Sequence, residues 1–281
     1  METKAEIDKF NMSYVFKFEK TFDEGAFNTY MKEHWADSVI YATVYIIVVF
    51  GTQFYMHSRK KLELRPFLAF WSGLLAIFSI LGSIRTMPEL IIGLKVHGFE
   101  YSLCNNSFVL QGSITSVWTC MFTLSKVLEL GDTVFIVLRK QPLIFLHWYH
   151  HVTVLMYTWF TYSQHVAAGR WFMVMNFVVH SFMYSYYCFR AMKYSFPKWV
   201  NMFITSLQLL QMLVGICVNV VSYQILNEGR ECDQNYDNIK YALMMYFSYF
   251  ILFAHFFYTS YVVKKPAGHH HHTTTDKQKK H

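Results

Sequence analysis

Residues 143–162, LIFLHWYHHVTVLMYTWFTY, predict a membrane protein, because this segment is apolar and long enough to cross a bilayer. It also contains three histidines, His147, His150 and His151. A helix turns by about 100° per residue, so the three rings share one helix face. Histidines inside a membrane cost free energy, and this face therefore predicts a functional site.

The composition extends the membrane interpretation to the whole chain. Hydrophobic residues make up 54% and charged residues 15% of the 281 residues, which leaves no stretch for a separate soluble domain. Seven segments reach the length of about twenty residues that one span needs. They are residues 36–56, 66–84, 113–137, 142–162, 167–189, 199–223 and 240–262. We therefore predict a single all-α, polytopic membrane domain over residues 1–281 with seven transmembrane helices.

Basic residues in the predicted loops favour a luminal N-terminus and a cytosolic C-terminus, because short cytosolic loops carry an excess of Lys and Arg. The loops that would be cytosolic contain Arg59, Lys60, Lys61, Arg65, Arg139, Lys140, Arg190, Lys193, Lys198, Lys264 and Lys265. The opposite loops contain Arg85, Lys95, Arg170 and Arg230. Residues 1–35 would form a luminal segment without the apolar region of a cleavable signal peptide, and residues 264–281 a cytosolic tail.

Two pairs of residues predict covalent features on the luminal side. Cys104 and Cys232 lie in two luminal loops, where an oxidising compartment permits a disulfide between them. Asn11 and Asn105 begin glycosylation triplets on the same side. We therefore expect one disulfide and two acceptor sites for glycans.

The predicted cytosolic side carries most of the basic residues and a sequence that resembles a retrieval signal. The net charge of +7 reflects an excess of Lys and Arg, which form a rim at the predicted cytosolic face. These cations either anchor the protein to lipid headgroups or bind the phosphate groups of a cofactor. Lys277 and Lys279 near the end of the tail resemble a dilysine retrieval signal, which predicts residence in the endoplasmic reticulum. The run from His269 to His272 is either natural or an added tag.

Four other predicted spans contain polar residues that a helix facing lipid would not have. These residues are Lys126, Glu129, Asp132 and Thr133 in the third span, Asn176, His180, Tyr184 and Tyr187 in the fifth, Thr205, Gln208 and Gln211 in the sixth, and His255 in the seventh. In the alternating topology, they and the three histidines lie within roughly 5–20 Å of the cytosolic face at about 1.5 Å per residue. Contacts between helices would explain one or two such groups. Agreement in depth among five spans favours a reaction chamber that faces the cytosol.

Three hypotheses fit histidine-rich walls in a membrane. The spacing His147-x-x-His150-His151 resembles one box of a membrane di-iron oxygenase, but the chain has one complete box, and Lys126 would place a positive charge near the metal. A non-enzymatic seven-helix transporter shares the topology but needs no such cluster. Without metal, an imidazole can be a base or an acyl-accepting nucleophile, while Asn, Gln and Tyr stabilise an oxyanion. An apolar chamber then suits an apolar acyl group.

The motifs resemble those of the very-long-chain fatty-acid elongases, the condensing enzymes of the endoplasmic reticulum, over nearly the whole chain. The matching motifs are Lys126-x-x-Glu129-x-x-Asp132-Thr133, His147-x-x-His150-His151, Asn176-x-x-x-His180-x-x-Met183-Tyr184-x-Tyr186-Tyr187 and Thr205-x-x-Gln208-x-x-Gln211. The histidine box and the run from Gly169 to Met173 look most like the branch that acts on saturated and monounsaturated chains of the palmitate class. Arg170 stands where that branch has a glycine.

This resemblance implies both a fold and a reaction. The fold is a seven-helix domain in which six helices form an inverted barrel around an acyl tunnel. The reaction joins an acyl-CoA to malonyl-CoA with loss of CO₂ and CoA, and gives a 3-ketoacyl-CoA two carbons longer. The expected partners are acyl-CoA, malonyl-CoA, membrane lipid, and the ketoreductase, dehydratase and enoyl reductase of the elongation cycle. We expect no permanently bound cofactor, no metal and no nucleic acid, and the sequence leaves a homo-oligomer open.

Carried onto this chain, the resemblance predicts roles for single residues. His150 would attack the acyl thioester or activate the attack, with His147 and His151 as a proton relay. His180 and Asn176 would stabilise the enolate and the oxyanion. The residues of the substrate site would be Lys126, Glu129, Asp132, Tyr184, Tyr187, Gln208, Gln211 and His255. The alternative is a purely structural role. The charged residues would then form a buried ion network, and the other polar residues would only connect neighbouring helices.

Overall fold

The computed structural model describes residues 14–263, and every regular element in that range is helical. The long helices are α4 (Asp37–Met56), α5 (Arg65–Val96), α7 (Ile114–Glu129), α8 (Gly131–Leu138), α9 (Phe145–Gln164), α10 (Gly169–Ala191), α11 (Lys198–Asn227) and α12 (Tyr236–Phe257). The short elements are α2 (Lys17–Thr21), α3 (Glu24–His34), α6 (Gly98–Cys104), the 3₁₀ turn η2 (Ser107–Val109) and the π-helical turn η3 (Tyr258–Val262). Asn11, Lys277, Lys279 and His269 to His272 lie outside the described residues.

Within residues 14–263, four helices are long and apolar enough to cross a membrane, judged by length and composition. They are α4, α5, α11, and α12 together with η3. The other predicted spans coincide with α7 and α8, α9, and α10, whose composition is less apolar because they carry the polar motifs of the third, fourth and fifth spans. The arrangement is that of a multi-pass membrane protein, while the number of crossings stays a prediction.

Two predicted spans differ from the observed helices. The second was expected to end at residue 84, before Arg85, but α5 continues to Val96. Arg85 and Glu89 are buried and lie in ion pairs with Glu19 and Arg170, so these charges do not end the helix. The third span is divided into α7 and α8 after Leu130. At this division a Cβ on Gly131 would come within 2.9 Å of the Trp71 ring, so the close approach of α5 requires glycine.

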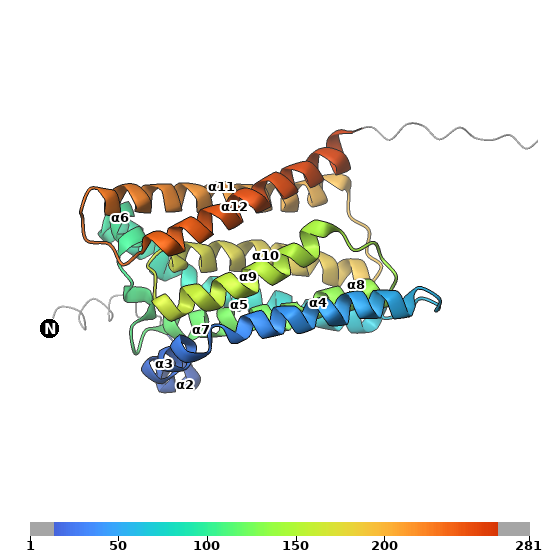
Figure 1. Cartoon of the computed structure of the whole chain (residues 1–281), viewed down its shortest axis with the longest axis horizontal. Helices are drawn as coiled ribbons and strands as arrows, with labels where there is room; N and C mark the ends of the chain where they lie inside the picture. The colour runs from blue at the N-terminus through green and yellow to red at the C-terminus, as the bar shows by residue number, and fades with distance from the viewer. Residues whose placement is uncertain (1–13, 264–281) are drawn as a thin grey trace, which may run out of the picture.

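Six helices follow one another around a closed circuit. Helix α9 packs against α12, α12 against α11, α11 against α10, α10 against α5, α5 against α7, and α7 against α9. Helix α4 lies outside this circuit and contacts α8 and α9. Figure 1 shows the long helices running along the length of the molecule, with the connecting loops at its two ends. The interior of the circuit is therefore bordered by α5, α7, α9, α10, α11 and α12.

Close contacts between helices depend on small residues. A Cβ on Gly82 of α5 would meet the Phe177 ring of α10 at 2.5 Å, and a Cβ on Gly215 of α11 would meet Tyr246 of α12 at 2.5 Å. Side chains at these positions would push the helices apart, because an added atom in a packed interior must displace its neighbours. These two glycines let neighbouring helices of the circuit pack closely.

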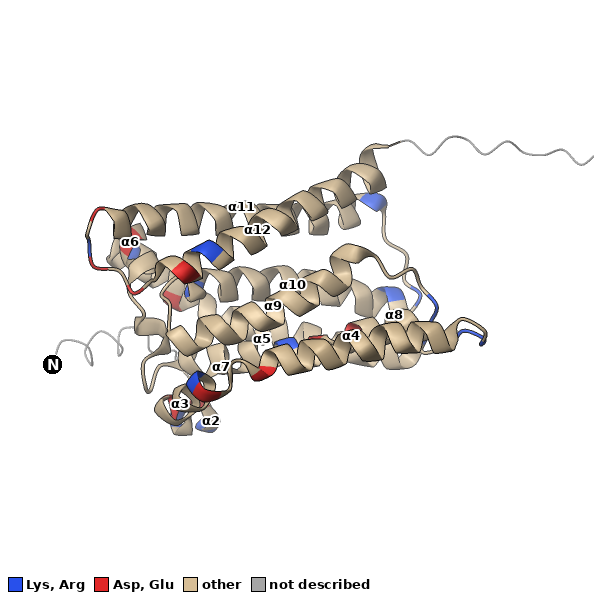
Figure 2. Ribbon diagram, in the orientation of Figure 1, with Lys and Arg blue, Asp and Glu red and all other residues tan. Residues whose placement is uncertain are grey.

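The two ends of the molecule differ in charge and in covalent structure. At one end, which we call the basic end, Lys and Arg predominate in the loops after α4, α8 and α10 (Figure 2). The other end, here the disulfide end, contains α2, α3, α6 and the bond between Cys104 and Cys232. The bond joins the two cysteines that the sequence analysis paired. The described chain begins at the disulfide end and finishes at the basic end (Figure 1).

Candidate functional site

A cavity of about 470 Å³ lies inside the helix circuit toward the basic end, and we call it the chamber. Its wall comes mainly from α8, α9, α10, α11 and the end of α12. It is lined by most of the residues that were predicted at the site, namely Asp132, His147, His150, His151, Asn176, His180, Tyr184, Tyr187, Gln208 and Gln211. The structure thus brings together polar groups from four separate stretches of sequence.

A narrow apolar cavity of about 60 Å³ continues from the chamber toward the disulfide end, and we call it the tunnel. One face of α9 forms its wall with His150, Val154, Tyr157, Thr158, Thr161, Tyr162 and His165. Both cavities are lined by His150, Asn176, Gln211 and Met212. The chamber and the tunnel therefore meet at these four residues.

His150 stands at the junction of the chamber and the tunnel. Its ring packs against Tyr249 at 4.9 Å between centroids, and the Tyr249 hydroxyl donates to the backbone carbonyl of His150 at 3.2 Å. Among residues 14–263, no side chain or backbone group is hydrogen-bonded to a ring nitrogen of His150. A ring nitrogen of this histidine is therefore available to react with a molecule in the cavity.

His180 belongs to a buried chain of hydrogen bonds. The Lys126 ammonium donates to Glu129 Oε1 at 2.6 Å and to Asn176 Oδ1 at 2.9 Å, and Lys126 is 1% exposed. Because Oδ1 is taken, the amide nitrogen of Asn176 faces His180 Nε2 at 3.1 Å and donates to it. A neutral His180 then carries its proton on Nδ1, which lies 3.8 Å from Glu129 Oε2. Lys126 thereby orients Asn176, and Asn176 fixes the tautomer of His180.

His147 is held by a second chain of hydrogen bonds that the sequence analysis missed. Its Nε2 lies 3.0 Å from the Thr133 hydroxyl, which lies 2.7 Å from the Tyr45 hydroxyl. Tyr45 belongs to α4 and is buried. One tyrosine among the aromatic residues of an apolar helix gives no sequence signal, so only the packing of α4 on α8 and α9 identifies it. His151, in contrast, has a buried Nδ1 without a hydrogen-bond partner among the described residues.

Asp132 lines the chamber, but both of its carboxylate oxygens are occupied. Oδ1 accepts a hydrogen bond from Trp71 Nε1 and Oδ2 accepts one from the Tyr184 hydroxyl, each at 2.7 Å. These bonds connect α8 to α5 and α10. Asp132 therefore positions neighbouring side chains instead of offering a free carboxylate to a ligand.

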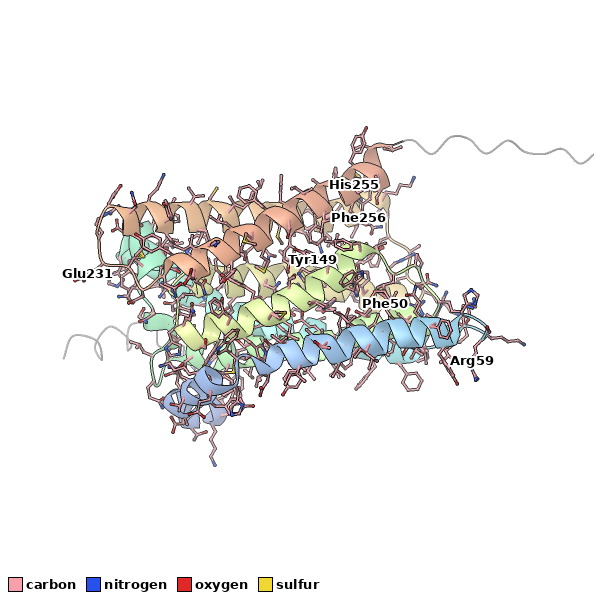
Figure 3. All side chains as sticks on the ribbon, viewed as in Figure 1. Phe50, Arg59, Tyr149, Glu231, His255 and Phe256 are labelled. Atoms are coloured by element: carbon pink, nitrogen blue, oxygen red, sulfur yellow. A yellow bond between two sulfur atoms is a disulfide. The ribbon has the colours of Figure 1, made fainter. Side chains whose placement is uncertain are left out.

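Three predicted substrate-site residues do not line either cavity. Lys126 and Glu129 are buried beside the chamber and act on it through Asn176 and His180. His255 is exposed on α12, whereas its neighbour Phe256 lines the chamber; both are labelled in Figure 3. Sequence spacing could not tell which face of α12 packs inward. Conversely, Arg139 lines the chamber at its basic end, and it was predicted only as a member of the cationic rim.

Comparison with known proteins agrees with the geometry. A model of the family described as "ELO: GNS1/SUR4 family" matches residues 30–269. The very long chain fatty acid elongase 6 of Drosophila melanogaster is 48% identical over 250 residues, which cover 88% of this chain and 79% of that protein. The human elongase 6 is 43% identical over 252 residues (88% and 94%), and the human elongase 3 is 42% identical over 257 residues (92% and 93%).

These matches decide between the three hypotheses that the histidine box left open. They cover the helices that border the chamber and the tunnel, and the relatives are named as elongases, not as oxygenases or transporters. The relatives named elongase 6 also agree with the palmitate-class branch that the motifs resembled. This chain therefore belongs to the ELO family and is a very-long-chain fatty-acid elongase.

Proposed function

We propose that this elongase condenses a long-chain acyl-CoA with malonyl-CoA through a covalent acyl group on His150. The observation that supports this most directly is the position of His150, which lines both the polar chamber and the apolar tunnel. An acyl chain in the tunnel would place its thioester at the junction, next to this ring. The CoA part would then occupy the chamber and extend toward the cations of the basic end, such as Arg139.

The first half-reaction transfers the acyl group to the enzyme. A ring nitrogen of His150 attacks the thioester carbonyl carbon, the C–S bond breaks, and the CoA thiolate leaves and takes a proton. His147 and His151 lie on the same face of α9, and the ring of His147 is 4.5 Å from that of His151 between centroids. They serve as the proton relay. The Thr133 and Tyr45 hydroxyls keep His147 in place for this step.

The second half-reaction forms the new C–C bond. Malonyl-CoA loses CO₂ to give an enolate, the enolate attacks the acyl carbonyl carbon, and the bond to His150 breaks. The second amide N–H of Asn176 would donate to the enolate oxygen and to the tetrahedral oxygen, and His180 would hold this amide in place through its Nε2. The ion pair of Lys126 with Glu129 holds these two groups in the orientation that the step needs. The product is a 3-ketoacyl-CoA two carbons longer.

The tunnel must widen to accept an acyl chain. Its volume is about 60 Å³, and Met173, Met212 and Met245 line it. Unbranched, flexible methionine side chains change conformation at low cost, so they can make room for a hydrocarbon chain. Burial of each methylene in such a tunnel is favourable by about 0.8 kcal/mol, which would compensate the rearrangement.

The membrane arrangement is part of the same proposal. Seven spans, with the six-helix circuit as a barrel and α4 outside it, would place the chamber at the cytosolic side, where the CoA substrates are. The excess of Lys and Arg at the basic end supports a cytosolic basic end and a luminal disulfide end. A disulfide at the other end fits an oxidising lumen. We place the enzyme in the endoplasmic reticulum beside the ketoreductase, dehydratase and enoyl reductase that would use its product, alone or as a homo-oligomer.

Release of CoA before malonyl-CoA is added tests the covalent step. The purified enzyme with acyl-CoA alone should release about one equivalent of CoA per site and keep the acyl chain attached to the protein. The His150→Ala variant should lose this release, and its overall rate should fall roughly 10³-fold or more. The His180→Ala variant should still release CoA but should fail in the malonyl-dependent step.

The control is His255→Ala, which removes an exposed histidine outside both cavities and should leave both half-reactions unchanged. A wild-type enzyme that releases no CoA until malonyl-CoA is present would contradict the acyl-enzyme. His150 would then be a base in a direct condensation.

A further inference from the structure

The short helix α2 is fixed to the bundle by one buried carboxylate. Glu19 is 2% exposed and forms an ion pair with Arg85 of α5. Its Oε1 accepts hydrogen bonds from Arg85 Nε and from Trp118 Nε1 of α7, each at 2.8 Å. Its Oε2 accepts one from the backbone nitrogen of Phe16 at 2.8 Å, and Arg85 Nη1 donates to the carbonyl of Tyr14 at 3.1 Å. Helix α2 therefore has a fixed orientation on α5 and α7.

The chain around the start of α2 exposes three aromatic rings. Tyr14, Phe16 and Phe18 are 38–66% exposed. The Phe16 ring stacks on that of Phe18 at 5.6 Å between centroids and meets the Tyr14 ring edge to face at 5.1 Å. A contiguous apolar surface that the fold holds in place is favoured by removal from water, so it marks a surface for interaction. We call these three residues the aromatic face.

Other exposed aromatic residues surround the helix ends at the disulfide end. Trp35, just before α4, packs edge to face on Phe160 of α9 at 5.3 Å between centroids, and Phe160 packs on Tyr241 of α12 at 5.7 Å. Tyr223 near the end of α11 packs on Tyr236 at the start of α12 at 5.8 Å. Tyr and Trp are enriched where a membrane protein passes through the headgroup region. These five residues, which we call the girdle, therefore indicate a membrane surface at this level.

The aromatic face lies beside the part of the molecule that is apolar enough to span a membrane. Helix α3 ends at His34 and α4 begins at Asp37, so α2 and α3 are joined to α4 at the level of the girdle. Figure 1 shows α2 and α3 at the disulfide end, on the side of the bundle where α4 lies. The outer side of α4 is apolar and exposed, as at Ile40 and Ile47. The aromatic face thus continues an apolar helix surface instead of standing apart from it.

We propose that the aromatic face inserts between the phospholipid headgroups of the leaflet at the disulfide end. Amphipathic segments bind there by burying aromatic rings at the boundary between headgroups and acyl chains. Exposed Lys17 and Lys20 flank Phe18, and such side chains are long enough to reach the phosphates. Exposed Asp23 and Glu33 balance these two charges, so a zwitterionic phospholipid is sufficient. The inference goes beyond the proposed function, since it requires α4 in a membrane but no acyl-enzyme.

Fluorescence quenching of a tryptophan placed in the aromatic face tests this contact. The full-length Phe18→Trp variant is reconstituted in nanodiscs of phosphatidylcholine, and the wild-type signal from its seven tryptophans is subtracted. Phosphatidylcholine brominated on the acyl chains quenches from the membrane, and iodide quenches from water. Brominated lipid should remove about half or more of the added fluorescence, because the indole lies next to the acyl chains. Iodide should remove little of it.

Two control variants calibrate the two quenchers. Glu231→Trp adds an indole to an exposed loop at the outer edge of the disulfide end (Figure 3), where iodide should quench it and brominated lipid should not. Ile47→Trp adds one to the exposed side of α4, where only brominated lipid should quench it.

Three results would overturn the inference. The first is quenching of Phe18→Trp by iodide to the same extent as Glu231→Trp. The second is protection of Phe18→Trp from both quenchers, because protein would then cover the aromatic face. The third is an Ile47→Trp signal that brominated lipid does not quench, which would contradict the position of α4 in the membrane. The CoA release described above tests the condensation chemistry independently of all three.

Discussion

Two buried ion pairs, Lys126–Glu129 and Arg170–Glu89, have the same chemistry but different neighbours. Lys126 donates onward to Asn176, which contacts His180 at the wall of the chamber. Arg170 donates onward to Ser102 and Ser107, which belong to the segments at the disulfide end. Both cations are 1% exposed. Burial and charge alone therefore do not identify a catalytic group in this protein, and the groups to which each pair is bonded distinguish their roles.

The largest expected difference between the two pairs is in kcat. Lys126→Met should reduce kcat by about 10²-fold or more, because Asn176 and His180 lose their fixed orientation. Arg170→Met should leave kcat for short acyl chains nearly unchanged. Each variant leaves a carboxylate buried without its partner, so each should lose about 3–5 kcal/mol of stability. Steady-state kinetics and thermal unfolding in the same detergent measure both quantities.

A double variant separates stability from catalysis at the Lys126 pair. Lys126→Met together with Glu129→Gln removes both charges and should recover much of the lost stability, since a buried pair can be replaced by uncharged groups at little cost. Its kcat should stay low. Recovery of kcat together with stability would mean that the pair only locks helices and has no part in the orientation of His180.

The chain from Tyr45 to His147 should have an intermediate effect. Thr133→Val removes the hydroxyl between them and leaves His147 Nε2 and the Tyr45 hydroxyl without this partner. We expect a loss of about 1–3 kcal/mol in stability and a decrease in the acyl-transfer rate of about tenfold. Thr86→Val is the matched control, because Thr86 is also 0% exposed but bonds only to the backbone of its own helix. Equal rate losses in both variants would contradict the proposed role of Thr133.

The smallest expected effect concerns pH at the disulfide end. His165 Nε2 lies 2.7 Å from Glu24 Oε1, and burial lowers the pKa of His165 to about 4. The unfolded chain takes up this proton near pH 6.5, so stability should fall as pH decreases from about 6.5 to about 4. Burial also raises the pKa of Glu24, which opposes this trend, and Glu24→Gln removes that second titration. Unfolding temperature should decrease by roughly 2–4 °C per kcal/mol lost.

Adding His165→Gln to the Glu24→Gln variant provides the comparison. The double variant should lose the dependence of unfolding temperature on pH in this window. A pH dependence that remains in the double variant would show that other groups titrate in this window.

Features that depend on local spacing could be predicted without the structure. An apolar run of about twenty residues predicts a helix wherever it packs, and the spacing of His147, His150 and His151 places them on one face of α9. The motifs from Lys126 to Gln211 were sufficient for the family resemblance, and one cysteine in each of two loops predicted on the same side was sufficient for the pairing. These signals need no knowledge of which helix lies beside which.

The groups that meet across helices could be identified only from the packing of the folded chain. Tyr45 reaches His147 through Thr133, Arg170 reaches Glu89 over 81 positions in the sequence, and His255 points away from a chamber that its neighbour Phe256 lines. The extension of α5 past Arg85 has the same origin, because charges that find partners in the fold no longer mark the end of a helix. Helical periodicity gives the direction of a side chain relative to its own helix, but its partner depends on the packing of the other helices, which is set by non-local contacts.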